Sequence, residues 1–245
     1  MVEGDKVNMT YIFLAAGRGA RLHPLTLETP KSLYKLDKNT TILQRMIRII
    51  KECDAEAKIV IVGGFLFEEV KKEMKSIPNI TYVFNPFYEV TNSIASLWFA
   101  REYLDGDTVI INGDIVMEKK LVDLIVCGPI VKPVVLVDSS IKKNGDYNVQ
   151  ILNDRVLVMS KNLDEYYGEY AGVTKIDNEA AHNLCAKIET MVSKGMYDQW
   201  YENALVQMIF DDDFTLYYED ISQYKWTEVD NVGDMLLAKT IQSQF

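Results

Sequence analysis

The segment from Leu14 to Leu33, LAAGRGARLHPLTLETPKSL, combines small residues with positive charge. Small residues leave main-chain N–H groups uncovered, so a polyphosphate can approach the backbone closely. The small residues are Ala15, Ala16, Gly17, Gly19 and Ala20, and the cations are Arg18, Arg21 and Lys31. This combination favours a site for a nucleoside triphosphate, although two glycines after a strand are also typical of an ordinary tight turn.

Two familiar phosphate motifs do not fit this segment. The P-loop requires GxxxxGK[ST], and the dinucleotide fingerprint requires GxGxxG opening directly into a helix. Here the GRG sequence is followed by Pro24 and Pro30 instead. Because proline interrupts helices, we expect a long loop over the edge of a sheet.

Two carboxylates in distant parts of the chain could hold a metal ion. Asp114 follows Gly113 just beyond the apolar run TVIIN, and Asp230 precedes an expected last helix. Mg²⁺ takes hard oxygen ligands, often one or two carboxylates plus phosphate oxygens. Each aspartate also has a possible structural role. Asp114 could be an ordinary turn residue, and Asp230 could be the N-cap of the helix.

Short apolar runs alternate with helical patterns up to about residue 136, which predicts crossover connections and a mostly parallel sheet. The expected strands are TYIFLAA, KIVIVGG, ITYVFN and TVIINGD, and the expected helices are Ile42 to Cys53, Leu66 to Ser76 and Ser93 to Tyr103. Ligands of such sheets bind at the carboxyl ends of the strands, so the turns after Ala15 and Ile111 matter most.

The pattern changes after the run PVVLVD. NVQIL and RVLVMS, with a turn at Asn153 and Asp154, predict a hairpin, and AGVTKI predicts another strand. Helices are expected over Glu179 to Lys194, over Gln199 to Phe210 and from Asn231, with a strand at FTLYY. The predicted fold class is α/β: a Rossmann-like, mostly parallel sheet flanked by helices, with a small antiparallel insert. We expect a single domain over residues 1–245, with a nucleotide-binding half to about 136 and an acceptor-binding part over 137–245.

The composition excludes several classes of protein. With 26 Lys and Arg against 36 Asp and Glu, the formal charge of −10 argues against a partner of DNA or RNA. Three scattered cysteines without a CxxC suggest neither a disulfide framework nor a zinc cluster. The sequence shows no long uninterrupted apolar run, so we expect a cytoplasmic protein without a membrane partner.

The segment from Leu14 to Leu33 resembles the signature LAAGxGxRLxPLTxxxPKxL of the nucleotidyltransferase family that includes sugar-1-phosphate nucleotidylyltransferases. The resemblance implies that Gly17 and Gly19 hold the triphosphate, together with backbone at Leu14, Ala15, Ala16 and Gly113. It implies catalytic roles for Arg21, on the outer phosphates, and for Lys31, between the α-phosphate and the acceptor phosphate. It also implies that Asp114 and Asp230 hold Mg²⁺.

The segment from Asn85 to Trp98, NPFYEVTNSIASLW, resembles the cytidylyltransferase branch, which includes bacterial enzymes that activate phosphocholine or phosphoglutamine. Asn92 and Ser93 open an expected helix and could contact a cytosine, with helix capping as the alternative. Further matches suggest that the acceptor contacts Lys161, Glu169, Tyr201 and Glu202, beside Trp200. Surface charge and helix packing are the alternative roles of these residues.

The sequence therefore predicts an EC 2.7.7 enzyme that transfers CMP from CTP to a small phosphorylated acceptor such as phosphoglutamine or phosphocholine. Pyrophosphate is the expected second product, and surface-polysaccharide (capsule) modification is the expected setting. One alternative is a sugar-1-phosphate nucleotidylyltransferase that uses UTP or dTTP. Another is a catalytically silent nucleotide-binding regulatory subunit. A homodimer is compatible with the sequence.

Overall fold

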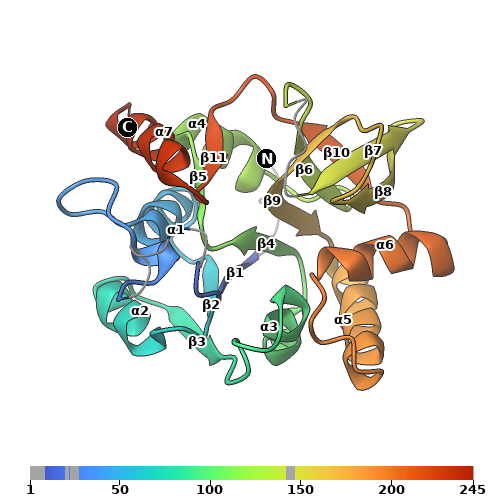
Figure 1. The fold of residues 1–245 in the computed structure, drawn as a ribbon, viewed down its shortest axis with the longest axis horizontal. Coiled ribbons are helices and arrows are strands. Elements are labelled where there is room, and N and C mark those ends of the chain that lie inside the picture. Colours follow the sequence, from blue (N-terminus) through green and yellow to red (C-terminus); the bar gives the residue numbers. More distant parts are fainter. Residues whose placement is uncertain (1–8, 20–21, 23–27, 142–146, 245) are drawn as a thin grey trace, which may run out of the picture.

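The computed structural model describes residues 9–19, 22, 28–141 and 147–244, and it has a mixed sheet with helices on both faces (Figure 1). The strand order along the main sheet is β10-β6-β9-β4-β1-β2-β3. The parallel part consists of β1 (Thr10–Ala15), β2 (Lys58–Gly63), β3 (Ile80–Phe84) and β4 (Thr108–Asn112). The predicted crossover architecture is confirmed.

The remaining strands of the main sheet run in mixed directions. The long strand β9 (Gly168–Ile176) pairs antiparallel with β4 and with β6 (Val134–Asp138), and β10 (Tyr217–Asp220) runs parallel to β6. The predicted hairpin is formed by β7 (Asn148–Leu152) and β8 (Arg155–Ser160). Asn153 and Asp154 both have left-handed backbone, with φ of 49° and 62°, which suits a two-residue hairpin turn. The small antiparallel insert is thus present.

Helices cover the two faces of the sheet and bury two separate cores. One core contains α1 (Ile42–Cys53) and α2 (Phe67–Met74), and the other contains α3 (Ser93–Phe99), α5 (Asn178–Ser193) and α6 (Glu202–Asp211). Figure 1 shows these groups on opposite sides of β1 and β4. The bounds of α1 match the prediction because Thr41 and Gln44 form a capping box at its start.

A second, two-stranded sheet lies beside the first and was not predicted. Its strands are β5 (Ile115–Met117) and β11 (Trp226–Glu228), which pair antiparallel. The helix α7 (Val232–Ser243) packs against this sheet, and Figure 1 shows it next to β5 and β11. A third apolar cluster, which includes Val116, Val229 and Ala238, joins these elements.

The remaining helical segments are short. They are 3-10 helices at Lys31–Leu33 and Arg101–Tyr103, the helix α4 (Lys119–Leu121) and a π-helical turn at Val122–Val126.

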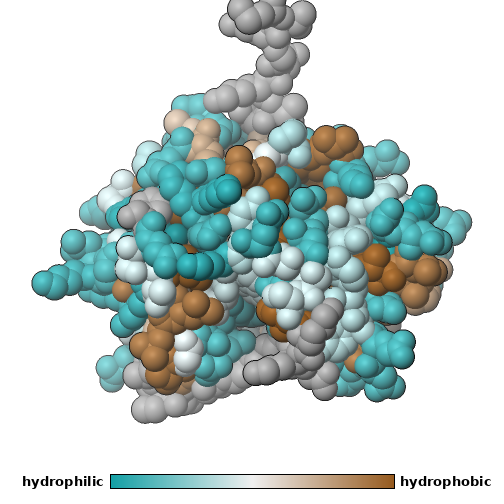
Figure 2. All heavy atoms as spheres, turned by 90° about the horizontal axis from the view of Figure 1, so that it is seen from above, coloured by the Kyte–Doolittle hydropathy of each residue, from teal (hydrophilic) through white to brown (hydrophobic). Residues whose placement is uncertain are grey.

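None of the described helices combines the length and the apolar character that a bilayer span requires. On the face shown in Figure 2, apolar residues form separate patches among hydrophilic ones.

Candidate functional site

The carboxyl ends of β1 and β4 meet at Gly113. Its N–H donates a hydrogen bond of 2.8 Å to the carbonyl oxygen of Leu14. A Cβ atom at this position would lie 2.7 Å from the Cβ of Ala15 and 2.9 Å from the Leu14 oxygen. Since real Cβ contacts are longer, the approach of the two strand ends requires glycine here. This approach places Asp114 beside the loop that follows β1.

The two-stranded sheet brings a second set of acids to the same place. Glu228 lies opposite Ile115 in the β5–β11 ladder, and the N–H of Val229 donates to the carbonyl oxygen of Asp114 at 3.1 Å. Carboxylate oxygens of Asp114, Glu228 and Asp230 all lie within 4.8 Å of one another. The structure therefore gathers the two predicted ligands and adds Glu228 to them.

Glu228 was missed because its strand was missed. A signal was present in the sequence TEVD: Val229 is fully buried in the apolar cluster under α7, while the acids on either side of it face the opposite way. Alternation of this kind is typical of a strand with one face in the core.

The N-cap of α7 is Asn231 rather than Asp230. The Asn231 side chain accepts hydrogen bonds from the N–H groups of Gly233 and Asp234, and the Asp234 carboxylate accepts one from the N–H of Asn231. Asp234 thus completes a capping box. The capping role that was an alternative for Asp230 belongs to its neighbours.

Lys31 lies between the two aspartates. Its Nζ is 2.6 Å from Oδ1 of Asp230 and forms a second ion pair with Oδ2 of Asp114. Burial by itself would lower the pKa of the Lys31 ammonium, but attraction to Asp114 and Asp230 outweighs this effect and raises the pKa above its usual value. The other predicted catalytic residue, Arg21, and the loop residue Ala20 lie outside the described residues.

The carboxylates suit a hard divalent cation such as Mg²⁺. They offer oxygen ligands, and Oδ1 of Asp114 is buried without a hydrogen-bond partner in the part of the chain that the structure describes. A buried carboxylate oxygen without a partner is costly, and a bound cation would satisfy it. Asp114, Glu228 and Asp230 are the residues that would hold the ion.

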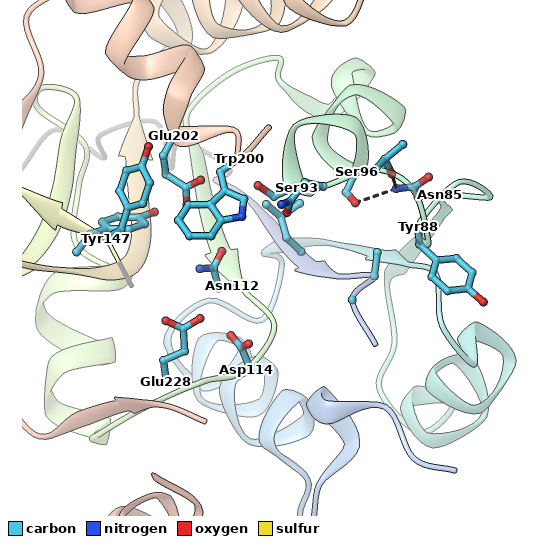
Figure 3. Close-up of a pocket in the computed structure, with 16 residues that line it drawn as sticks. Asn85, Tyr88, Ser93, Ser96, Asn112, Asp114, Tyr147, Trp200, Glu202 and Glu228 are labelled. Atoms are coloured by element: carbon cyan, nitrogen blue, oxygen red, sulfur yellow. Dashed lines mark hydrogen bonds between the residues drawn. The ribbon is translucent and has the colours of Figure 1, made fainter. Parts of the chain in front are cut away.

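A pocket opens above these acids and is shown in Figure 3. Its lining residues are Leu14, Ala16 and Gly17 from the predicted loop, Asn85, Tyr88, Thr91, Asn92, Ser93 and Ser96 around α3, Asn112, Asp114 and Glu228 at the strand ends, and Tyr147, Tyr170, Trp200 and Glu202. We call this hollow the central pocket. Figure 3 shows Tyr147, Trp200 and Glu202 on one side and Tyr88 and Asn85 on the other.

Two further residues were predicted to contact the triphosphate from the loop. Ala15 is buried at the end of β1, and Gly19 has a left-handed backbone, with φ of 63°.

Asn92 and Ser93 line the central pocket and also serve the fold. The Oδ1 atom of Asn92 accepts the N–H of Ser93 at 2.8 Å, which caps α3. The Ser93 hydroxyl accepts the N–H of Tyr201 at 2.9 Å and thereby joins α3 to the start of α6. The capping alternative for Asn92 is therefore observed, while contact of either residue with a base stays a prediction.

The adjacent residues Tyr201 and Glu202 have different surroundings. Tyr201 is fully buried, and its hydroxyl is bound to Tyr170 at 2.6 Å and to Thr174 at 2.9 Å. It is a core residue and not the acceptor contact that we predicted, because helix packing turns its ring away from the pocket. Glu202 lines the central pocket at 5% exposure, and burial raises the pKa of its carboxyl to about 8.

The other predicted acceptor residues lie in two adjoining hollows. Lys161 lines a pocket that shares Trp200 with the central one, and its Nζ is 4.1 Å from the centre of the Trp200 ring. Glu169 lines a different hollow, together with Asp138, Trp226, Glu228 and Asp230. This hollow borders the three clustered acids from another side. We call this hollow the acidic pocket. Glu228 borders both the central and the acidic pocket.

Comparisons with known proteins bear on what this arrangement does. The family model described as nucleotidyl transferase matches residues 10–126. A choline-phosphate cytidylyltransferase from Haemophilus influenzae is 32% identical over 113 residues, which are 46% of this chain and 47% of that protein. A CTP:phosphoglutamine cytidylyltransferase from Campylobacter jejuni is 23% identical, with 93% of this chain and 98% of that protein covered.

A solved structure of CTP:phosphocholine cytidylyltransferase from Streptococcus pneumoniae superimposes with a TM-score of 0.78. At 21% identity it covers 96% of this chain and 100% of the other, so it shows a shared fold. Several curated relatives are matched over only about half of their length or less. The resemblance drawn from the loop motif is confirmed: residues 10–126 match the nucleotidyl transferase family model, and cytidylyltransferases are among the similar proteins.

Proposed function

We propose that this protein is a cytidylyltransferase that transfers CMP from CTP to a small phosphorylated acceptor and releases pyrophosphate. The observation that carries the proposal is the meeting of Lys31 with Asp114 and Asp230 at the central pocket, with Glu228 beside them. Nucleotidyl transfer joins two anions, so positioning and charge neutralisation supply most of its catalysis. The similarity to cytidylyltransferases supports CTP as the nucleotide.

In the proposed reaction an oxygen of the acceptor phosphate attacks the α-phosphorus of CTP. A new P–O bond forms to the acceptor, and the bond between the α-phosphorus and the bridging oxygen of pyrophosphate breaks. Bound Mg²⁺ would neutralise phosphate charge during this exchange. Lys31 would place its ammonium between the two anions, and the loop at Gly17 would offer main-chain N–H groups to the triphosphate. An acceptor phosphate already carries its attacking oxygen, so the proposal requires no general base.

The side chains around Trp200 support an acceptor that carries both an amine and a carboxylate. Glu202 offers an acid and Tyr147 and Trp200 offer aromatic faces, which suit an ammonium group. Lys161 places its Nζ over the same ring, 4.1 Å from the ring centre, and this cation could meet a carboxylate of the acceptor. An amino-acid phosphate such as phosphoglutamine fits this set better than phosphocholine, which has no carboxylate. A cytoplasmic setting and surface-polysaccharide modification belong to the same proposal.

Pyrophosphate release tests the proposal directly. Four nucleoside triphosphates are assayed against phosphoglutamine, phosphocholine and glucose-1-phosphate, and we expect CTP with phosphoglutamine to be used best. A preference for UTP or dTTP with glucose-1-phosphate would identify the sugar-1-phosphate enzyme instead. Binding of CTP by calorimetry without any product would identify a silent regulatory subunit.

The variant Asp114→Asn tests the site. We expect turnover to fall at least about a hundredfold while the circular dichroism spectrum is unchanged. An amide is neutral and binds Mg²⁺ more weakly than a carboxylate does. Asp213→Asn, at an exposed turn, is the matched control and should keep full activity. Near-normal turnover of Asp114→Asn would refute the assignment.

A further inference from the structure

The contact of Lys31 with two acids joins three segments that are far apart in the sequence. Lys31 lies on a 3-10 turn, Asp114 follows β4, and Asp230 precedes α7. The three side chains are only 13%, 14% and 15% exposed. Charges this far from water are weakly screened, so the lysine is firmly held where it lies.

The acids that hold Lys31 are also the acids that suit a divalent cation. Asp114 and Asp230 are two of the three carboxylates that lie within 4.8 Å of one another. An ammonium and a divalent cation cannot both sit against the same two carboxylates without strong repulsion. Lysine has a flexible four-carbon stem with a compact charge at its end, so it can move from one partner to another.

We propose that Lys31 is an exchangeable counter-ion of this site: a divalent cation displaces its ammonium from Asp114 and Asp230, and the ammonium then pairs with phosphate oxygens of the nucleotide. The second half of the exchange rests on the proposed function. A metal that arrives alone leaves the ammonium without its partners in a largely buried place, which is costly. A metal that arrives with triphosphate avoids this cost, because the phosphate oxygens become new partners of the ammonium.

Two consequences follow from the exchange. Metal without nucleotide binds weakly because it must expel Lys31. Metal and nucleotide strengthen each other's binding, and by thermodynamic reciprocity each does so by the same factor.

Mn²⁺ binding without nucleotide tests the first consequence, with the free ion measured by its electron paramagnetic resonance signal. We expect Lys31→Met to bind Mn²⁺ at least about tenfold more tightly than the unaltered protein, since the competing cation is gone. Lys35→Met, at an exposed position four residues along, should bind as the unaltered protein does. Equal or weaker binding by Lys31→Met, or no binding by either protein, would overturn the exchange.

A labelling experiment on the unaltered protein covers the case in which Lys31→Met fails to fold. Acetic anhydride modifies free amines, and mass spectrometry measures the modification of Lys31. We expect little modification without metal, more in saturating Mn²⁺ alone, and protection again in Mn²⁺ with CTP. If Mn²⁺ alone leaves the reactivity of Lys31 unchanged, the exchange is wrong. Since neither readout uses turnover, a failure of CMP transfer would count against the proposed function only.

Discussion

Glu202 is an acid held almost entirely out of water in a wall of the central pocket. Burial penalises its charged form and raises the pKa of the carboxyl to about 8. At neutral pH the group is therefore mostly protonated, and a positively charged ligand beside it would favour the carboxylate. Binding of an ammonium-bearing acceptor should thus release a proton and strengthen as the pH rises.

This coupling gives a pH-dependent prediction. The KM for phosphoglutamine should fall between pH 6 and pH 9 as Glu202 ionises, and Glu202→Gln should lose most of this dependence. Steady-state kinetics across the range measures both proteins, with Glu165→Gln at an exposed loop as the control. A KM profile that is the same in Glu202→Gln and the unaltered protein would contradict the role.

The same residue affects stability with a definite sign. Its folded-state pKa of about 8 lies above the usual value of 4.5, so the folded form is favoured while the acid is protonated and loses stability as the pH rises through that window. At pH 9, Glu202→Gln should therefore be more stable than the unaltered protein by roughly 3–5 kcal/mol, and near pH 4 the difference should vanish. Urea unfolding at the two pH values measures this, and a gain of the same size at both would refute it.

Glu228 gives another prediction for a single residue. Its oxygen lies with those of Asp114 and Asp230, so Glu228→Gln should weaken Mn²⁺ binding about tenfold or more with the fold intact. Mn²⁺ titration in the presence of CTP measures the effect, with Glu165→Gln again as the control. Unchanged affinity would limit the metal site to the two aspartates.

At the scale of elements, the position of the acids depends on how α7 and the two-stranded sheet are held. Arg45 of α1 is buried, and its Nε donates to Oε1 of Gln242 in α7 at 2.8 Å. Its Nη1 donates to the carbonyl oxygen of Met117 at the end of β5. One guanidinium thus ties together the helix that follows Asp230 and the strand that follows Asp114.

Replacing this residue should therefore loosen the site from a distance. Arg45→Met leaves the Met117 carbonyl without its donor, and we expect it to lower the free energy of unfolding by roughly 2 kcal/mol and to weaken Mn²⁺ binding. Arg48→Met, on the exposed side of the same helix, should change neither quantity. Chemical denaturation and Mn²⁺ titration measure the two effects. Loss of stability without loss of metal affinity would show that the site does not depend on the hydrogen bonds of Arg45.

Elements governed by neighbouring residues were predictable from the sequence. The helix Ile42–Cys53 has its own capping box, and the hairpin has its own turn at Asn153 and Asp154. The strands β5 and β11 have three residues each and pair across more than a hundred positions, so the short alternation in TEVD does not reveal the partner of β11. Glu228 was missed for this reason, whereas Asp114 and Asp230 were found through a motif.

The start of α6 shows the same limit. The pattern placed the helix from Gln199, but it begins at Glu202, because the N–H of Tyr201 is bound by Ser93 of a distant helix. That shift decides which of two neighbouring side chains faces the pocket. Tyr201 enters the core and Glu202 lines the wall, a distinction that periodicity alone could not make.

At the scale of the whole molecule, an acidic chain is proposed to bind a highly charged anion. The net charge of −10 opposes this, so binding depends on local cations such as Lys31 and on the metal. The protein should therefore gain stability from nucleotide and metal together. Either one alone should have a smaller effect.

Thermal unfolding measures this gain and the choice of base together. With Mg²⁺ and CTP at a hundred times the dissociation constant, the free energy of unfolding should rise by about 2.7 kcal/mol. The midpoint should then rise by roughly 5–10 °C for a chain of this length. Mg²⁺ with UTP at the same concentration should give a clearly smaller shift. An equal shift with UTP would contradict selectivity for cytosine.

The pairing of β5 with β11 also has a consequence for synthesis. Residues 10–126, which match the family model, emerge from the ribosome about a hundred residues before Glu228 and Asp230. Lys31 and Asp114 are therefore synthesised well before Asp230, the second acid that pairs with Lys31. Glu228 and Asp230 join Asp114 only when β11 pairs with β5. Until then the nascent chain has Asp114 but lacks Glu228 and Asp230, so the three-carboxylate site can be completed only near the end of synthesis.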